Sequence, residues 1–264
     1  MIQARSYAPG DILLVTLVKS SPVREAKIVF LNRDYRLKVR DEGGEPLALI
    51  GLDLGLKPGR YDMDLTLVYK GNEQETVRKS ITVIPRKFPF TKIVLAEKYV
   101  VPPAKELERI RREAALAAEV YARVTGRWLG EGWFILPHEA QMLFNFGERR
   151  VYNNETRSVH SGVDIEATLG SAIIASNSGT VALAADLYFS GKTVILDHGL
   201  GVSTSYFHMS RLLVRTGDVV HKGDTIGEAG STGRSTGPHL HWAARVFDSR
   251  VDPRSLIRLP LGDW

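Results

Sequence analysis

Two separated pairs of metal-binding residue types constrain this chain more than any other feature, because they must meet in space to act together. The first pair is His160 and Asp164, and the second, His239 and His241, begins 75 residues after that aspartate. A catalytic zinc site takes three protein ligands and keeps a fourth position for water. If residues 238–242 form a strand, His239 and His241 share a face, because strand side chains alternate. Either pair alone would be explained by chance surface histidines, whereas both pairs in a glycine-rich context predict one metal centre.

Length and composition set broad limits. The 264 residues suffice for one large domain or two small ones, with 44% apolar and 25% charged residues, as in ordinary globular proteins. No run of about 18 apolar residues is present, so we expect no transmembrane helix. The absence of cysteine excludes disulfides, thiolate zinc ligands and a cysteine nucleophile.

The net charge of +5 favours an anionic partner. No run of lysine and arginine with interleaved aromatic residues marks a nucleic-acid-binding face, so we expect no nucleic-acid partner. An anionic cell wall or membrane surface fits the charge equally well.

The N-terminal residues 1–88 are expected to form a small β-sandwich, immunoglobulin-like in the loose sense. Apolar and polar residues alternate over residues 61–69 and again over residues 76–84, with a turn at Gly71-Asn72 between them. No pocket chemistry is evident there, which indicates an accessory module.

Residues 89–127 are expected to be a linker that contains a helix over residues 103–126. Prolines at positions 102 and 103 and the glycine at position 126 are a typical start and stop. From residue 128 to residue 264 the sequence becomes glycine-rich β sequence, so a second, mainly β domain is expected there.

The motifs of residues 128–264 resemble those of the lysostaphin/LytM-type zinc endopeptidases, which cut peptide cross-links in bacterial cell walls. The first motif is Ser158-Val159-His160-Ser161-Gly162-Val163-Asp164-Ile165. The middle block is Asp197-His198-Gly199 followed by Tyr206-Phe207-His208-Met209-Ser210. The most specific stretch runs from Gly230 to Trp242, through Gly237-Pro238-His239-Leu240-His241.

The resemblance implies a fold, a reaction and a set of site residues. The fold would be an antiparallel, lipoyl-like β-sheet. One Zn²⁺ would be held by His160, Asp164 and His241, and His208 with His239 would serve acid–base chemistry or steady the developing oxyanion. We expect the loop residues Ser235, Thr236 and Gly237 to form one wall of a groove for peptidoglycan peptide stems. Zinc lowers the pKa of bound water from 15.7 to about 7, which supplies a nucleophile at neutral pH.

Two local patterns match other catalytic motifs only in part, and two further histidines are not assigned to the site. His138-Glu139 begins a zincin motif, but position 142 is Met where that motif needs His. Gly233-Arg234-Ser235-Thr236-Gly237 matches a serine-hydrolase elbow, yet Pro238 and a strand are expected where that elbow requires a helix. His198 in a glycine-bounded turn is expected to be structural, and His221 to lie on the surface.

Two other functions remain open. A latent LytM-type regulator would bind or activate other wall hydrolases, although such proteins have lost ligands or catalytic histidines. A carrier domain of related fold is disfavoured by the full zinc set. The N-terminal region could gate the groove. A wall enzyme must be exported, so we expect a periplasmic or cell-envelope location and a trimmed signal peptide, since residues 1–7 lack an apolar core.

Overall fold

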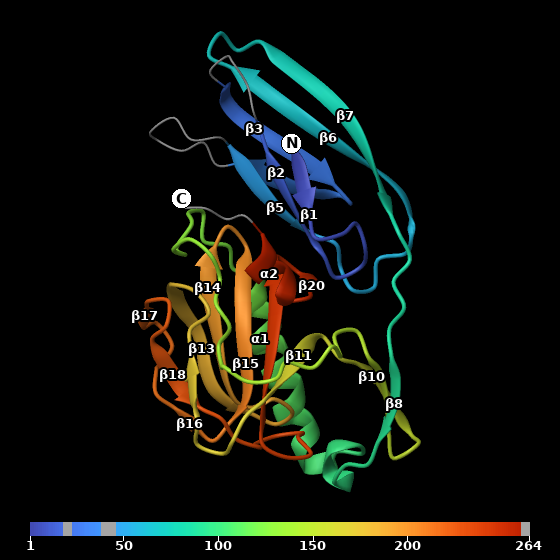
Figure 1. The fold of residues 1–264 in the computed structure, drawn as a ribbon, viewed down its shortest axis with the longest axis vertical. Coiled ribbons are helices and arrows are strands. Elements are labelled where there is room, and N and C mark those ends of the chain that lie inside the picture. Colours follow the sequence, from blue (N-terminus) through green and yellow to red (C-terminus); the bar gives the residue numbers. More distant parts are fainter. Residues whose placement is uncertain (18–22, 38–45, 260–264) are drawn as a thin grey trace.

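The computed structural model describes residues 1–17, 23–37 and 46–259, and the chain is mainly β with antiparallel sheets. A β-rich N-terminal module stands above a second β-rich module in Figure 1, and the chain passes between them through a long extended segment on one side. None of the helices in these described ranges is long and apolar enough to cross a membrane.

The N-terminal module consists of two sheets that share one core. The first sheet has the order β1 (Ile2–Ala4), β2 (Ile12–Thr16), β5 (Leu47–Gly51). The second has the order β4 (Arg33–Leu37), β3 (Val23–Phe30), β6 (Gly59–Tyr69), β7 (Gln74–Val83). Leu13 and Ile50 of the first sheet and Ile28 and Leu67 of the second belong to one buried cluster. The two alternating stretches of the sequence correspond to β6 and β7, which confirms these strands.

The strand order departs from that of an immunoglobulin constant domain in one strand. In that fold the fourth strand pairs with the fifth, in the sheet of the first two strands. Here β4 pairs with β3 through a two-residue turn at Leu31 and Asn32, both of which have positive φ. Because a tight two-residue turn of this kind favours a hairpin, β4 stays beside β3 and leaves β5 as an edge strand.

The linker contains a strand and a helix. Its elements are β8 (Phe90–Ile93), the 3₁₀ turns at Glu97–Tyr99 and Ala104–Glu106, and α1 (Leu107–Ala122). Helix α1 is therefore shorter at both ends than the predicted range of 103–126, with a 3₁₀ turn in place of its first residues. Arg123 is already extended, because Thr125 bonds to Asp197 and its carbonyl oxygen accepts the Leu200 amide, which draws the chain onto the turn between two strands.

A seven-stranded antiparallel sheet organises the C-terminal module. Its strands, in spatial order, are β11 (Gly162–Glu166), β19 (His239–Val246), β15 (Val202–Met209), β14 (Gly191–Gly199), β13 (Gly179–Leu187) and β17 (Val219–Val220), with β20 (Ser249–Val251) paired to β19. A small sheet contains β12 (Ala172–Ile174), β18 (Thr225–Glu228) and β16 (Arg211–Leu212). The short helix α2 (Arg254–Arg258) follows β20.

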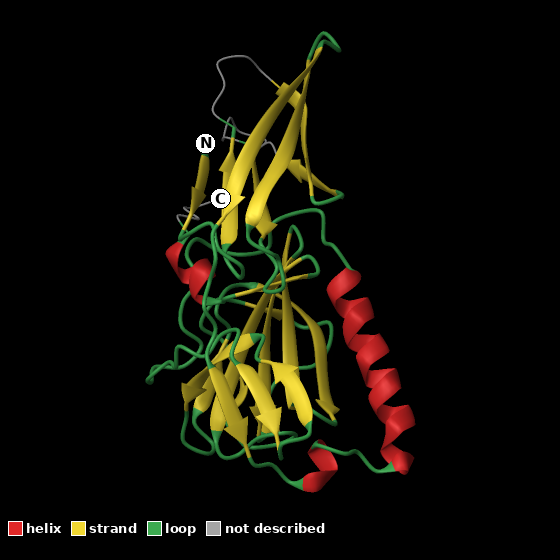
Figure 2. Cartoon of the chain, turned by 90° about the vertical axis from the view of Figure 1, so that its right-hand side faces the viewer, coloured by secondary structure: helices red, strands yellow, loops and turns green. Residues whose placement is uncertain are grey.

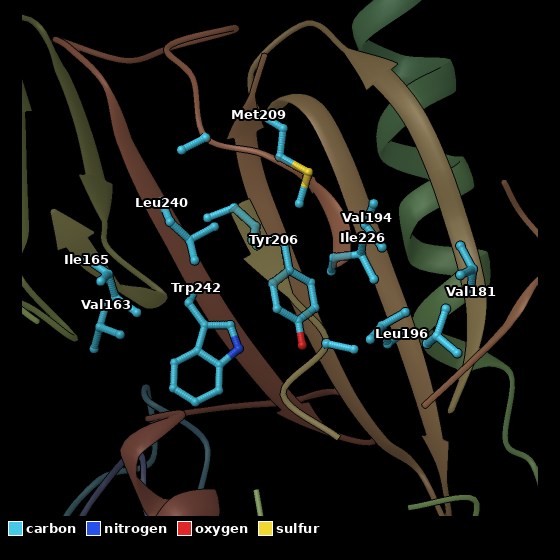
Figure 3. Close-up of a cluster of buried hydrophobic side chains, with 14 of the residues drawn as sticks. Val163, Ile165, Val181, Val194, Leu196, Tyr206, Met209, Ile226, Leu240 and Trp242 are labelled. Carbon is cyan, nitrogen blue, oxygen red and sulfur yellow. The ribbon is translucent and has the colours of Figure 1, made fainter. Parts of the chain in front are cut away.

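The two faces of this large sheet carry different residues because strand side chains alternate. Leu240 and Trp242 of β19 point into the buried core with Tyr206 of β15, as Figure 3 shows. His239 and His241 occupy the alternate positions and lie on the opposite face. Helix α1 runs alongside the sheet (Figure 2) and packs on it through Val120. The opposite face thus carries both the helix and the two histidines of β19.

A third sheet connects the linker to the face of the C-terminal module that carries the two histidines of β19. Strand β8 pairs in parallel with β9 (Arg149–Tyr152), which forms a hairpin with β10 (Thr156–Val159). Asn153 in the hairpin turn binds back to the linker, because its amide oxygen accepts the Leu95 amide and its amide nitrogen donates to the Leu95 carbonyl. The hairpin leads directly into the segment that carries His160.

The two modules are joined by a shared apolar cluster. Ile12, Leu14 and Leu49 of the N-terminal module pack in one buried group with Val246 and Leu256 of the C-terminal module. The division at residues 88 and 127 remains a prediction.

Candidate metal centre and active site

Three of the predicted metal ligands meet at one point. The register of β11 and β19 sets Asp164 directly opposite His241, and His160 lies two residues before the start of β11. The His160 Nε2 atom lies 2.7 Å from His241 Nδ1, and each nitrogen lies 3.0 Å from Asp164 Oδ1. These separations are near the roughly 3.3 Å edge of a tetrahedral site with bonds of about 2.0–2.1 Å. The three side chains therefore fit a zinc-sized cation.

Neighbouring groups fix which atoms of Asp164 and His160 face that point. Asn145 Nδ2 and Arg150 Nη2 donate to Asp164 Oδ2 at 2.8 and 3.0 Å, which leaves Oδ1 toward the histidines. His160 Nδ1 lies 3.0 Å from the Asn145 carbonyl oxygen, which can only accept a hydrogen bond. The proton of this imidazole is therefore on Nδ1, and the Nε2 lone pair points at the ligand position.

The His241 ring is held by packing. Phe207, opposite His241 in β15, stacks on it with the ring planes 3° apart and the centroids 5.1 Å apart. Gly162 allows the ring to sit close to β11, because a Cβ at this position would lie 2.6 Å from His241 Nε2. The position of this ligand thus depends on an aromatic neighbour and on a missing side chain.

Burial and charge set the protonation states that metal binding needs. Burial and the charge of His160 together lower the pKa of His241 to about 4, against the opposing effect of Asp164. Burial favours the neutral acid at Asp164, but bonds and charges from His160 and His241 outweigh it and hold the pKa of Asp164 well below its usual range. At neutral pH the cluster thus offers a neutral imidazole at His241 and a carboxylate at Asp164.

The two predicted catalytic histidines lie beside the cluster, and each has its Nδ1 atom bonded to a backbone carbonyl. The rings of His208 and His239 are 5.0 Å apart between centroids, and His239 Nε2 is 3.7 Å from Asp164 Oδ1. His208 Nδ1 donates to the Thr232 carbonyl and His239 Nδ1 to the Gly237 carbonyl, both at 2.8 Å. Each imidazole therefore keeps its Nε2 lone pair free to accept a proton. Burial, with the charges of His241 and His239, lowers the pKa of His208 to about 3.

The loop before β19 lies next to these histidines. Ser235 Oγ is 3.3 Å from His239 Nδ1 and donates to the Gly237 carbonyl oxygen at 2.7 Å, while Thr236 is exposed. A strand follows Pro238, as expected, so the arrangement required for a serine nucleophile is absent from this described segment. The substrate role of Ser235, Thr236 and Gly237 remains a prediction.

A cavity of about 180 Å³ adjoins the metal cluster. Its lining comes from four regions: the hairpin and following residues (Arg150, Tyr152, Ser158, Val159, His160, Ser161), the turn between β13 and β14 (Phe189, Ser190), the strands β15 and β19 (Phe207, His208, His241) and Arg234. Within the loop that precedes β19, the side chain reaching this cavity is thus Arg234, one residue before the predicted wall.

The three other histidines of the sequence, His138, His198 and His221, lie away from this point. His198 is fully buried, with Nδ1 2.8 Å from the Ser178 carbonyl and Nε2 2.7 Å from Thr204 Oγ1, in keeping with a structural role. His138 is half-buried and His221 is exposed. Asn153 ties the hairpin to the linker, and Tyr152 lines the cavity.

Sequence reasoning missed three residues that position the site. Asn145 and Arg150 hold Asp164, and Thr232 holds His208 through its carbonyl. The Thr232 hydroxyl donates to the Met209 carbonyl and accepts the Lys192 amide, which pins this loop to the sheet. Arg150, flanked by other charged residues, gave no signal of its own, and Asn145 lies outside the recognised motifs.

Comparison with known proteins agrees with this geometry. The sequence model of peptidase family M23 matches residues 158–253, which include all five predicted ligand and catalytic positions. A curated relative from Haemophilus influenzae, named only as an uncharacterized metalloprotease, is 36% identical over 145 residues, covering 53% of this chain and 30% of the relative. The peptidoglycan DD-endopeptidase ShyC of Vibrio cholerae is 38% identical over 117 residues, covering 44% and 27%. The chain thus spans less than a third of the length of either relative.

A solved structure extends the likeness to the whole chain. A Pseudomonas aeruginosa protein described as a candidate M23 peptidase superposes with a TM-score of 0.72 at 28% identity, covering 96% of both chains. The N-terminal module and the linker therefore recur in that protein together with the large sheet. The motifs, the cluster of His160, Asp164 and His241, and these matches agree with one another. Residues 158–253 of this chain therefore form a domain of peptidase family M23, the LytM-type peptidases.

Proposed function

We propose that this protein is a zinc-dependent endopeptidase that hydrolyses the peptide cross-links of bacterial peptidoglycan. One observation carries the proposal: three ligand atoms converge within 2.7 to 3.0 Å, and two imidazoles with free Nε2 atoms lie beside them. The donor set of two imidazoles and one carboxylate suits zinc in a catalytic site. His160, Asp164 and His241 would hold the ion.

The division of labour follows from the fixed imidazoles. A bound zinc ion would supply Lewis acidity and lower the pKa of water toward 7. His208 and His239 cannot rotate freely, because their Nδ1–H groups are bonded to backbone carbonyls. Either Nε2 can accept the proton of the attacking water and then donate it to the departing amine, a contribution of about 10² to 10⁴ in rate.

The substrate proposal is supported by the relatives. The Vibrio cholerae relative is named a peptidoglycan DD-endopeptidase, and relatives of 39% identity in Neisseria are named DD-carboxypeptidase/endopeptidases. We accordingly propose the D-alanyl–diaminopimelate cross-link as the bond that is cut, with the peptide stems held along Ser235, Thr236 and Gly237. Such a substrate implies a periplasmic or cell-envelope location.

The size of the cavity keeps the latent regulator as a second candidate. At about 180 Å³ it is smaller than the roughly 300–1,000 Å³ of most ligand sites. The β9–β10 hairpin forms one side of it and is tied to the linker through Asn153, which also supports the gating hypothesis. A peptide would need that wall to move, and turnover decides whether it does.

The test is digestion of purified cross-linked muropeptides by the zinc-loaded full chain, with the products identified by mass spectrometry. Loss of dimers that is blocked by a chelator and by His239→Ala supports the enzyme and names the bond. If the dimers stay intact although each chain binds one zinc ion, the latent regulator replaces the endopeptidase as the proposed function.

A further inference from the structure

Arg234 places a positive charge in the cavity beside the metal cluster, and no described carboxylate pairs with it. Its side chain lines the cavity beside His160, His208 and His241 and is only partly exposed. The residue lies outside the metal cluster and outside the catalytic pair. Its surroundings indicate what it binds.

The guanidinium is clamped between two aromatic rings. Its Cζ atom lies 4.8 Å from the ring centroid of Tyr152 and 4.8 Å from that of Phe189. The Arg234 amide also donates to the Phe189 carbonyl at 2.7 Å. The loop lies tightly against the turn between β13 and β14. Gly233 has a φ of +71°, and a Cβ on it would lie only 2.4 Å from the Gly191 nitrogen. The side chain is therefore held in place before any ligand arrives.

The guanidinium of Arg234 forms neither a hydrogen bond nor an ion pair with any residue that the structure describes. The contrast with Arg150 in the same cavity is direct, since Arg150 bonds to both Glu148 and Asp164. Burial, with the nearby positive charge of Arg150, lowers the pKa of Arg234. A partly buried cation without an acceptor is unfavourable, and five N–H donors in a planar fork match a carboxylate.

We propose that Arg234 binds a free carboxylate of the substrate next to the scissile amide, and so selects cross-links that carry one. The inference rests on the proposed peptidoglycan endopeptidase function and adds a specificity determinant to it. In a D-alanyl–diaminopimelate link, the carbon that bears the departing amine also bears a carboxylate. A bridge made of glycine has no such group inside the bridge, so the clamp would be left unpaired by that substrate.

The experiment compares two peptide dimers that differ in one group. Both contain the D-alanyl–meso-diaminopimelate link, and the carboxylate on the amine-bearing carbon is free in one and a carboxamide in the other. We expect the zinc-loaded full chain to cut the carboxylate dimer with a kcat/KM at least about tenfold higher, as for a charge-assisted hydrogen bond. Arg234→Met should remove this preference by slowing only the carboxylate dimer.

Arg245→Met provides the matched control. Arg245 also stacks on a tyrosine, with Cζ 4.1 Å from the centroid of Tyr121 in helix α1, but it lies four residues beyond His241 in β19 and is absent from the cavity lining. This variant should keep the full preference. Zinc content and circular dichroism of each variant check the fold, and Arg234→Lys serves if Arg234→Met does not fold, with a reduced preference expected.

The outcomes separate the two proposals. Equal cleavage of both dimers by the wild type overturns the role of Arg234 and leaves the endopeptidase intact. Cleavage of neither dimer by zinc-loaded protein overturns the endopeptidase itself. A preference that persists in Arg234→Met would assign carboxylate recognition to another group. As a second readout, calorimetry should show that metal-free wild type binds the free-carboxylate peptide more tightly than its carboxamide, and that Arg234→Met does not.

Discussion

Arg150 donates a hydrogen bond to Asp164 Oδ2 at 3.0 Å and thereby leaves Oδ1 facing the two ligand histidines. The arginine comes from the β9–β10 hairpin, whereas the aspartate comes from the large sheet. Because β9 pairs with β8, the linker that follows the N-terminal module contributes to the orientation of a metal ligand. The metal cluster is thus supported from outside the segment that carries its motifs.

This relationship predicts that Arg150→Met weakens metal binding. Removal of the donor frees the carboxylate to rotate, and loss of such a supporting partner typically costs 10- to 100-fold in metal affinity. Competition with a chromophoric chelator measures the affinity. Arg157→Met is the control, since Arg157 lies on the neighbouring strand β10, is exposed and should leave the affinity unchanged. Equal affinities for wild type and Arg150→Met would show that β11 and Asn145 orient Asp164 without the arginine.

A second prediction concerns the close approach of β11 to His241. In Gly162→Ala the new Cβ would lie 2.5 Å from the Trp242 carbonyl oxygen and 2.6 Å from His241 Nε2. The strands must separate or the imidazole must move, so we expect at least about a tenfold loss of zinc affinity together with a loss of stability of about 1–3 kcal/mol. Chelator competition and urea denaturation measure the two effects.

Gly71→Ala is the matched control for this substitution. A Cβ at Gly71 meets no atom within 4 Å, so both quantities should stay at their wild-type values. If Gly162→Ala binds zinc as tightly as wild type, the close contact is not what places the His241 ring.

Features of this site that depend on one short segment can be predicted from the sequence, whereas features that depend on the pairing of distant segments cannot. His239 and His241 were expected to share a face because alternation within one strand decides it, and β19 begins at His239. The spacing of four residues between His160 and Asp164 fits a helical turn, a strand or a loop. The strand register of Asp164 against His241 decides the matter, and a register is a property of two distant segments.

The residues that support the site were less accessible to sequence reasoning. Asn145 acts partly through its backbone carbonyl, and Thr232 holds His208 only through its own carbonyl, a group that every residue carries. Arg234 lies in the family stretch from Gly230 to Trp242 and in the hydrolase-elbow match, but it was given no role, because nothing local shows that Tyr152 and Phe189 enclose it. The helix end was missed for the same reason, since Thr125 is bound by Asp197, 72 residues away.

A third prediction is a loss of stability in mild acid that originates at His198. This side chain is fully buried, and burial lowers its pKa to about 4 from an ordinary 6.5. The unfolded chain therefore binds a proton on this histidine more readily than the folded chain does. The stability that depends on neutral His198 is complete above about pH 6.5 and is lost as the pH falls toward 4, by on the order of 3 kcal/mol.

Urea denaturation of wild type and His198→Gln between pH 7 and pH 4 isolates this effect, because the carboxylates common to both proteins cancel. The variant should be less stable at pH 7, since it loses the bonds to Ser178 and Thr204, but it should decline less steeply on acidification. Parallel stability curves would rule out His198 as the titrating group.

The last prediction concerns Asp252, whose ion pairs connect the two modules. This fully buried carboxylate pairs with Arg5 of the N-terminal module, Arg86 of the linker and Arg254 of α2, at 3.0, 2.9 and 2.6 Å between Oδ2 and a guanidinium nitrogen. Burial favours the neutral acid, but these arginines outweigh it and hold the pKa of Asp252 at about 2. Asp252→Asn would leave three guanidinium groups facing a neutral amide, and such a broken buried pair typically costs about 3–5 kcal/mol.

Denaturation of Asp252→Asn, followed by both tryptophan fluorescence and far-UV circular dichroism, tests this role. If the ion cluster and the apolar contacts of Ile12, Leu14 and Leu49 act together, wild type unfolds in one transition, and the variant shifts that transition as a whole. Asp64→Asn is the control, because its partner Arg78 and the pair itself are solvent-exposed and nearly neutral in effect. Two separate transitions in wild type would instead show that the modules are independent, which would also favour gating by their relative motion over gating by the hairpin alone.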